Sequence, residues 1–65
     1  MKKSFIIINK ENGLMLSENV INNGLADRKK IEWVSNKDDA ITFDYNPRIL
    51  MSTLGIEKTA FAIAV

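Results

Sequence analysis

The chain has 65 residues, of which 46% are hydrophobic, and nine basic against eight acidic residues give a net charge of +1. Such a balance provides no electrostatic case for binding nucleic acid, an anionic membrane or an acidic substrate. The sequence contains no Cys and no His, which excludes disulfides, thiolate nucleophiles and Cys/His zinc sites. We expect a single domain over residues 1–65, and because a domain of this size buries only roughly 60% of its unfolded surface, it needs an efficient core or a partner.

The first apolar segment predicts a central strand. Residues 4–9 contain Phe5 and three consecutive isoleucines, and apolar residues on both faces are typical of a strand with neighbours on either side. Asn12 and Gly13 then predict a hairpin, because both residues tolerate a positive φ, and residues 14–17 form its second strand. The apolar run is too short for a secretion signal or a membrane span, so we expect a cytoplasmic protein.

The pattern weakens over residues 18–30, where three Asn and one Gly interrupt scattered apolar residues. A structureless run of this length is uncommon in a compact domain, so we expect a helical turn or a short strand within it. Strand character returns at residues 31–34, where Ile31 and Trp33 share one face. Trp33 is expected to anchor the core.

Ser35 and Asp38 have the spacing of a capping box, in which each side chain bonds the backbone near the other. Asp38 and Asp39 also suit the positive end of a helix dipole. These residues predict a short helix that contacts the core through Ala40 and Ile41.

A second helix is predicted with Asn46 as its N-cap and Pro47 at its first position. Gly55 is its expected left-handed stop, and residues 56–65 form the closing strand. The spacing i, i+3, i+4 predicts that the packed face of this helix consists of Ile49, Leu50, Thr53 and Leu54. The order strand, strand, loop, strand, helix, helix, strand predicts an α+β fold, with short helices on one face of a small antiparallel sheet.

Residues 5–17, together with Trp33 and the Ala-x-x-Phe segment of residues 40–43, resemble a loose group of very short, mostly uncharacterised bacteriophage proteins. Members typically open with a hairpin of Val or Ile, Asn, Lys, Gly, an aromatic residue or Leu, then Leu and Ser. They then place a Trp and an Ala-x-x-Phe segment before a helix. Here Leu14 and Met15 stand where an aromatic residue is common, and the closing strand lies outside the pattern. The resemblance implies a phage or mobile-element origin and transfers no site residue.

No catalytic constellation is recognisable in the sequence. The three glycines are far apart and fit turns or caps rather than a phosphate loop. Asp38, Asp39 and Asp44 have the ligand chemistry of a hard-metal site, but the first two fit a helix start better. The serine hydroxyls have no recognisable activating partner. We therefore expect no enzymatic activity, no cofactor and no metal site.

One local constellation fits nucleic acid. Arg28, Lys29 and Lys30, with Trp33 close behind, would combine phosphate contacts with base stacking. The neighbouring Glu32 and the near-neutral net charge favour instead a solvated turn before a strand whose Trp belongs to the core. A minor nucleic-acid-binding module is therefore the alternative hypothesis, and its affinity would fall steeply with salt.

The main hypothesis rests on surplus apolar surface. The strand of residues 4–9 is apolar on both faces, whereas one helical layer covers only one face of a sheet. Alternation in the closing strand separates two sets of side chains, Phe61, Ile63 and Val65 on one face and Ala60, Ala62 and Ala64 on the other. We assign the first set to the core beneath the second helix. The small alanine face would then allow another backbone to approach closely.

The expected interface residues are Ile6, Ile8, Ala60, Ala62 and Ala64. They suggest a protein partner, which is either a second copy of the chain or a host or phage protein, because strand addition and sheet-face association both cover such surfaces. We expect a small phage-type protein-binding module that modulates or inhibits its target by steric occlusion, or that forms a homo-oligomer, without contact to a membrane.

Overall fold

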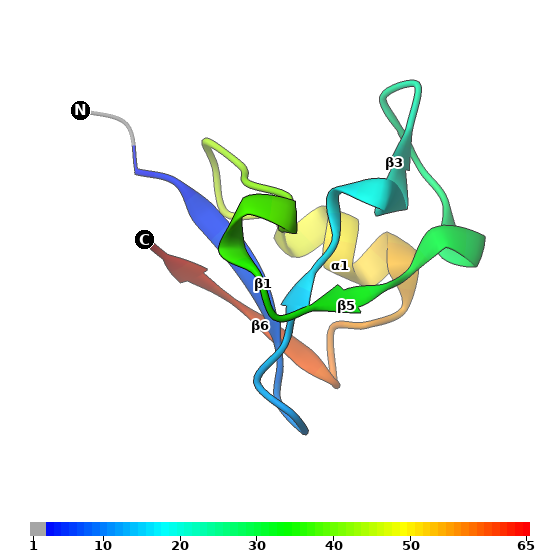
Figure 1. The fold of residues 1–65 in the computed structure, drawn as a ribbon. Coiled ribbons are helices and arrows are strands. Elements are labelled where there is room, and N and C mark those ends of the chain that lie inside the picture. The colour runs from blue at the N-terminus through cyan, green and yellow to red at the C-terminus, as the bar shows by residue number, and fades with distance from the viewer. Residues whose placement is uncertain (1–2) are drawn as a thin grey trace.

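The computed structural model describes residues 3–65. In this range the chain forms a four-stranded antiparallel sheet of order β5-β2-β1-β6, a separate β3-β4 hairpin, one α-helix and three single 3₁₀ turns (Figure 1). The elements are β1 (Phe5–Asn9), β2 (Met15–Leu16), η1 (Glu18–Val20), β3 (Ile21–Asn22), β4 (Leu25–Ala26), η2 (Arg28–Lys30), β5 (Trp33–Val34), η3 (Lys37–Asp39), α1 (Arg48–Leu54) and β6 (Ala60–Ala64). The predicted α+β class is confirmed.

β1 is the central strand, as its apolar character on both faces predicted. It pairs along its full length with β6, from Phe5 opposite Ala64 to Asn9 opposite Ala60. Its other edge pairs with β2 at one end. At the other end Phe5 and Phe43 exchange two backbone hydrogen bonds of 2.7 and 2.9 Å, so the segment before α1 completes the sheet.

The predicted hairpin between β1 and β2 is present, but its turn is longer than a two-residue Asn-Gly turn. The Asn9 carbonyl accepts from the Gly13 amide at 2.9 Å, and the Asn9 side chain accepts from the Glu11 amide at 2.8 Å. Gly13 has a positive φ of 73°, whereas Asn12 does not have a positive φ. Glycine alone therefore supplies the left-handed residue here.

The segment of residues 18–30 contains both kinds of predicted element, a helical turn and a short strand. Its centre is the β3-β4 hairpin, in which Asn22 pairs with Leu25. The two residues between them, Asn23 and Gly24, have φ values of 53° and 81°, as a type I′ turn requires. The Asn-Gly signal thus forms its two-residue hairpin at this position, which sequence reasoning took for a polar loop.

Replacing Gly24 by Ala is expected to lower the free energy of unfolding by about 1 kcal/mol, because a left-handed conformation costs an L-residue roughly 1–2 kcal/mol. A Cβ at this position meets no atom within 4 Å, so the cost is conformational and not steric. Gly24→Asn is the matched control and should cost less, since Asn visits this region readily. Equal losses in urea unfolding would contradict the assigned turn.

The α-helix is shorter than predicted, and its start differs. Pro47 occupies the cap position without a side-chain cap bond, and the Asn46 carbonyl, rather than its side chain, accepts from the helix at 2.9 Å. Gly55 ends the helix with φ 74°, as predicted. The buried residues of α1 are Met51 and Leu54. Ile49, predicted to pack on the sheet, is 85% exposed, because a two-turn helix can bury only one narrow stripe.

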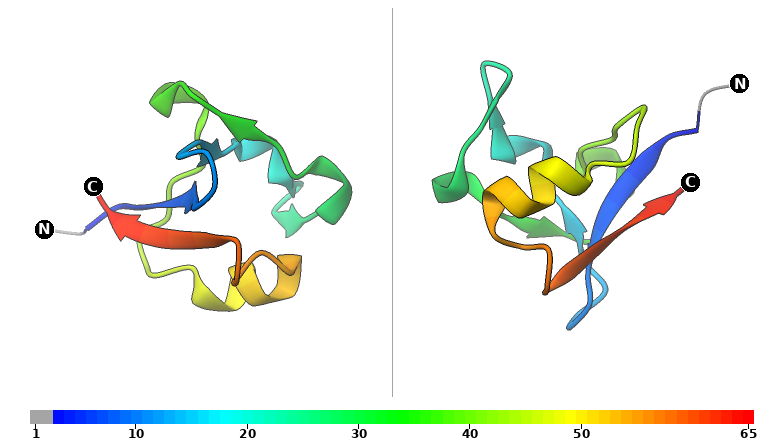
Figure 2. Two further views of the ribbon diagram at one scale, coloured as in Figure 1. Left: turned by 90° about the horizontal axis from the view of Figure 1, so that it is seen from below. Right: turned by 180° about the vertical axis from the view of Figure 1, so that it is seen from behind.

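The helix predicted after Ser35 is a single 3₁₀ turn, η3. Its cap is Asn36, whose side chain accepts from the Asp38 amide at 3.0 Å, so the predicted capping box of Ser35 with Asp38 is wrong. Ala40 is buried as expected, but it follows the turn in extended backbone and forms an isolated bridge with Ser17. The turn lies on the opposite side of β1 from α1 (Figures 1 and 2).

The core lies between the sheet, α1 and the turns of residues 18–30. Its buried members are Ile7, Leu16, Val20, Phe43, Met51, Leu54, Ile56 and Ala60. Trp33 and Ile31 are half-buried and pack against this cluster, as predicted. Only Trp33 belongs to a strand, because β5 is shorter than the predicted strand of residues 31–34 and Ile31 ends η2. A mixed β-branched, aromatic and Met set of this kind can fill an irregular space at the density that protein interiors require.

The two faces of β6 are reversed relative to the prediction. Ile7, at the centre of the core, lies opposite Ala62, so alternation puts the alanines on the face that carries α1. We call this the helix face, and the opposite face, with Ile6, Ile8, Phe61 and Ile63, the outer face. Ala60 is 1% exposed and Phe61 is 40% exposed. The period of two fixes which residues share a face but not which face is inward, and small alanines let α1 lie close to the sheet.

Candidate functional site

β6 is an edge strand, because in the order β5-β2-β1-β6 only β1 lies beside it. At one end of this pair the Lys10 amide donates to the Thr59 carbonyl at 2.9 Å, and at the other the Val65 amide donates to the Ser4 carbonyl at 2.8 Å. In an antiparallel ladder, hydrogen-bonded and non-bonded residue pairs alternate. These two bonds therefore fix the hydrogen-bonded pairs in between.

Half of the β6 backbone faces away from β1. By the alternation, Phe61 and Ile63 direct their amides and carbonyls toward β1, where they lie opposite Ile8 and Ile6. Ala62 and Ala64 direct theirs to the free edge. Within residues 3–65 no further backbone hydrogen bond reaches these two outward amides. The edge therefore offers donors and acceptors to an added strand.

This edge lacks the usual protection. Native proteins shield edge strands with Lys, Pro, a bulge or a covering element. From Ala60 to Ala64 the chain has no charged residue and no Pro, and the pairing with β1 is continuous. The Ala60 amide is satisfied by the Ile56 carbonyl at 2.9 Å. The unprotected stretch therefore begins after Ala60.

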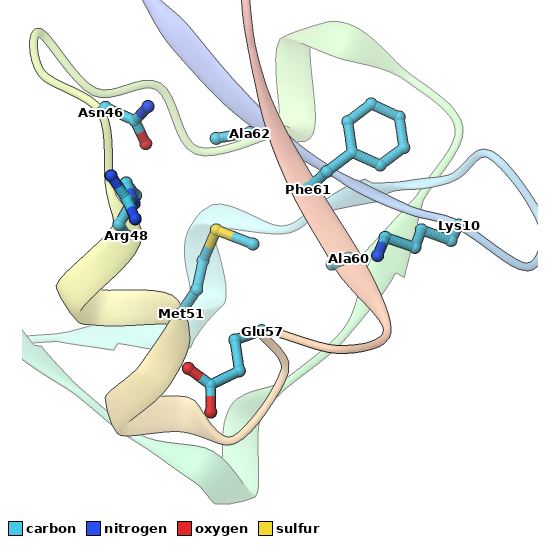
Figure 3. A pocket seen from close by; sticks show the side chains of 8 residues that line it. All are labelled: Lys10, Asn46, Arg48, Met51, Glu57, Ala60, Phe61 and Ala62. Atoms are coloured by element: carbon cyan, nitrogen blue, oxygen red, sulfur yellow. The ribbon is translucent and has the colours of Figure 1, made fainter.

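A groove of about 360 Å³ runs along the free edge (Figure 3). Residues 60–62 line its floor, and Asn46 and Arg48 stand at the start of α1 on one side. Lys10 and the ring of Phe61 lie on the other side of β6, away from α1 (Figure 3). A strand added here would thus lie between a polar wall and an aromatic one.

The wall on the α1 side carries opposite charges at its two ends. Arg48 lies next to Asn46 at the start of α1, across the groove from β6, and Glu57 lies near the start of β6 (Figure 3). A second hollow of about 480 Å³ continues along α1 and is lined by Arg48 and Glu57 as well. Ile49 lines it too. The exposed part of α1 is therefore continuous with the groove.

The outer face beside the edge is apolar. Ile8 pairs with Phe61 and Ile6 with Ile63, and such cross-strand pairs place their side chains in contact on one face. Ile63 and Ile8 are half-buried, whereas Phe61 is the exposed member next to the free edge. An added strand would extend this apolar row by its own outer-face residues.

The predicted interface residues differ in their exposure. Ile6 is 3% exposed and Ala60 is also buried, so both are excluded as surface contacts. Ile6 is buried although alternation places it on the outer face, and Ala60 is buried because it faces the core. Ile8 and Ala62 are half-buried, and Ala64 is exposed. The residues that were missed are Arg48, Glu57 and Phe61, because the site is formed by a backbone edge and not by a side-chain pattern.

The residues of the nucleic-acid alternative have separate surroundings. The Arg28 guanidinium donates to the Thr53 carbonyl at the end of α1, at 3.0 Å from Nε and 2.7 Å from Nη2. Trp33 packs against the core. Lys29 and Lys30 are exposed and line a shallow hollow together with Glu32. Lys29 and Lys30 are therefore available for phosphate contacts, whereas the exposed Arg28 guanidinium is held against the end of α1 by two of its donors.

No three His, Cys, Asp or Glu side chains of residues 3–65 lie together in a way that could hold a metal ion. The helices of this part of the chain are too short and too polar to cross a bilayer. No protein-family model matches the chain, and no curated protein or solved structure is significantly similar to it. The proposal of a function therefore rests on the geometry of this chain alone.

Proposed function

We propose that the chain is a small protein-binding module that takes an extended segment of another polypeptide as an additional strand along the free edge of β6. The outward amides and carbonyls of Ala62 and Ala64, in an uncharged edge strand with a groove beside it, carry this proposal. In strand addition, main-chain hydrogen bonds provide affinity and the alternating side chains provide specificity.

The mode of action that follows is steric occlusion. The edge of β6 holds a segment of the target, and the remainder of the domain covers the surface around it. The resemblance of residues 5–17 to short bacteriophage proteins supports a phage-type module that modulates or inhibits a host or phage protein in the cytoplasm. No cofactor is required for this mechanism.

The test is a titration of ¹⁵N-labelled protein with short capped peptides of alternating apolar and polar residues. Binding at the edge is expected to shift the amide signals of Ala62 and Ala64 and to slow their hydrogen exchange, because a new backbone partner protects them. The matched control is Ala64→Pro, which lacks one outward amide and keeps the bonds to β1. It should bind several-fold more weakly.

Two results would contradict the proposal. Peptides of this kind that leave Ala62 and Ala64 unchanged would show that the edge does not bind. A short single-stranded DNA that shifts Lys29, Lys30 and Trp33, with an affinity that falls steeply with salt, would support the nucleic-acid alternative instead.

A further inference from the structure

We infer that the preferred occupant of the β6 edge is an extended segment in which one acidic residue stands between two apolar residues. This inference rests on the proposed function and adds the chemistry of the partner. It follows from the side chains beside the groove, since the backbone edge itself is the same for every sequence.

The register of an added strand decides which side chains meet. A residue opposite Ala62 has its side chain on the helix face, because directly opposed residues of neighbouring strands share a face. Arg48 lies on that side of the groove, across from β6 and next to Asn46 (Figure 3). An Asp or Glu at this position therefore faces the wall that carries a guanidinium with several donors.

The two neighbours of that acidic residue lie on the outer face, opposite Phe61 and Ile63. Phe61 is 40% exposed, and apolar cross-strand partners on this face would cover its ring. The pattern of apolar, acidic and apolar residues thus matches an apolar outer face and a cationic helix face at the same time.

The other charges of the groove lie away from Ala62. Lys10 lies on the opposite side of β6, near Ala60 (Figure 3), so Arg48 is the cation on the helix face. Glu57 is the opposing charge, and it lies at the far end of the groove, near the start of β6 (Figure 3). A carboxylate opposite Ala62 therefore lies farther from the negative charge of Glu57 than a carboxylate near the start of β6 would, and the attraction to Arg48 outweighs the repulsion.

A second copy of this chain fits the edge less well. A two-fold axis at Ala62 would pair Ala60 with Ala64 of the second copy, and it would need the Ala60 amide that the Ile56 carbonyl already occupies. A two-fold axis at Ile63 would use only the outward amides of Ala62 and Ala64, but it would put Ala64 of the second copy opposite Ala62 and leave Arg48 without a carboxylate. An acidic segment of a different protein meets neither obstacle.

The experiment compares two capped peptides that differ only in one residue, a Glu or a Gln between two Val residues in an otherwise uncharged strand of Thr and Val. Their dissociation constants are measured by titration of ¹⁵N-labelled protein. The Glu peptide should bind about 1.5- to 5-fold more tightly, the range for an exposed ion pair, and the difference should shrink as salt rises.

The same comparison on the Arg48→Gln variant isolates the contact. Removing the guanidinium should abolish the advantage of Glu over Gln, while the Gln peptide keeps its affinity for the variant. Arg48 is exposed, so the fold should tolerate the change, and the amide spectrum checks this directly. Arg28→Gln is the control, since it removes a guanidinium remote from the groove and should preserve the advantage.

Each result has one meaning. Equal binding of the two peptides to the unmodified protein, or an advantage that survives in Arg48→Gln, overturns the inferred chemistry but leaves strand addition intact. Failure of both peptides to shift Ala62 and Ala64 overturns the proposed function itself. Sedimentation that shows a dimer with these amides protected, between about 1 µM and about 1 mM, would make a second copy the occupant and also overturn the inference.

Discussion

Replacing Leu16 by Ala is expected to remove about half of the protein's stability. Leu16 is 0% exposed and belongs to the core cluster, and truncation of such a residue costs about 2–5 kcal/mol. A chain of this length has a total stability of about 3–10 kcal/mol at the usual value per residue. The loss is therefore a large fraction of the total, and urea unfolding followed by the fluorescence of Trp33 would measure it.

Leu25 provides the matched control. It is 73% exposed at the β3-β4 hairpin, and the same change from Leu to Ala there should alter the free energy of unfolding by less than about 0.5 kcal/mol. Similar losses at the two positions would mean that the core does not lie where the structure puts it.

Proline substitution in β6 is expected to lower the free energy of unfolding strongly at Ile63 and only slightly at the neighbouring Ala64. The Ile63 amide faces β1, so Ile63→Pro removes a ladder bond, and it should cost about 3 kcal/mol more than Ile63→Ala, which loses the same side chain without touching the backbone. The Ala64 amide faces the free edge. Ala64→Pro should change stability by less than about 1 kcal/mol, since Pro is tolerated where its missing amide faces solvent.

The pair of prolines separates folding from binding. Ala64→Pro should yield a folded protein that binds an added strand several-fold more weakly, whereas Ile63→Pro should fail to fold. If Ala64→Pro were the more damaging substitution in chemical denaturation, the two edges of β6 would have been assigned the wrong way round.

The strand content of the fold was predictable because it follows from local patterns. Phe5 and the isoleucines after it predicted a central strand, and Gly55 predicted the end of α1, since each signal depends on residues close in sequence. The type I′ turn at Asn23 and Gly24 was equally local. It was missed because the two-residue strands on either side are too short to show an alternating pattern.

The inward face of β6 was not predictable in the same way. Alternation is symmetric, and the choice between Phe61 and Ala62 depends on how close α1 lies to the sheet, which is a tertiary property. The candidate site depends on the same information. An edge exists only once the strand order is known, and Arg48 and Ala62 are brought together by packing and not by spacing along the chain.

The pairing of Phe5 with Ala64 also governs how the protein folds. β1 is synthesised before its full-length partner β6, and most of the described chain lies between the two strands. Pairing between such distant segments carries a high loop-closure cost and slows folding. A nascent chain would therefore hold β1 with one open edge until β6 has emerged from the ribosome. Slow closure of this last strand would also be the step most exposed to misassembly at high concentration.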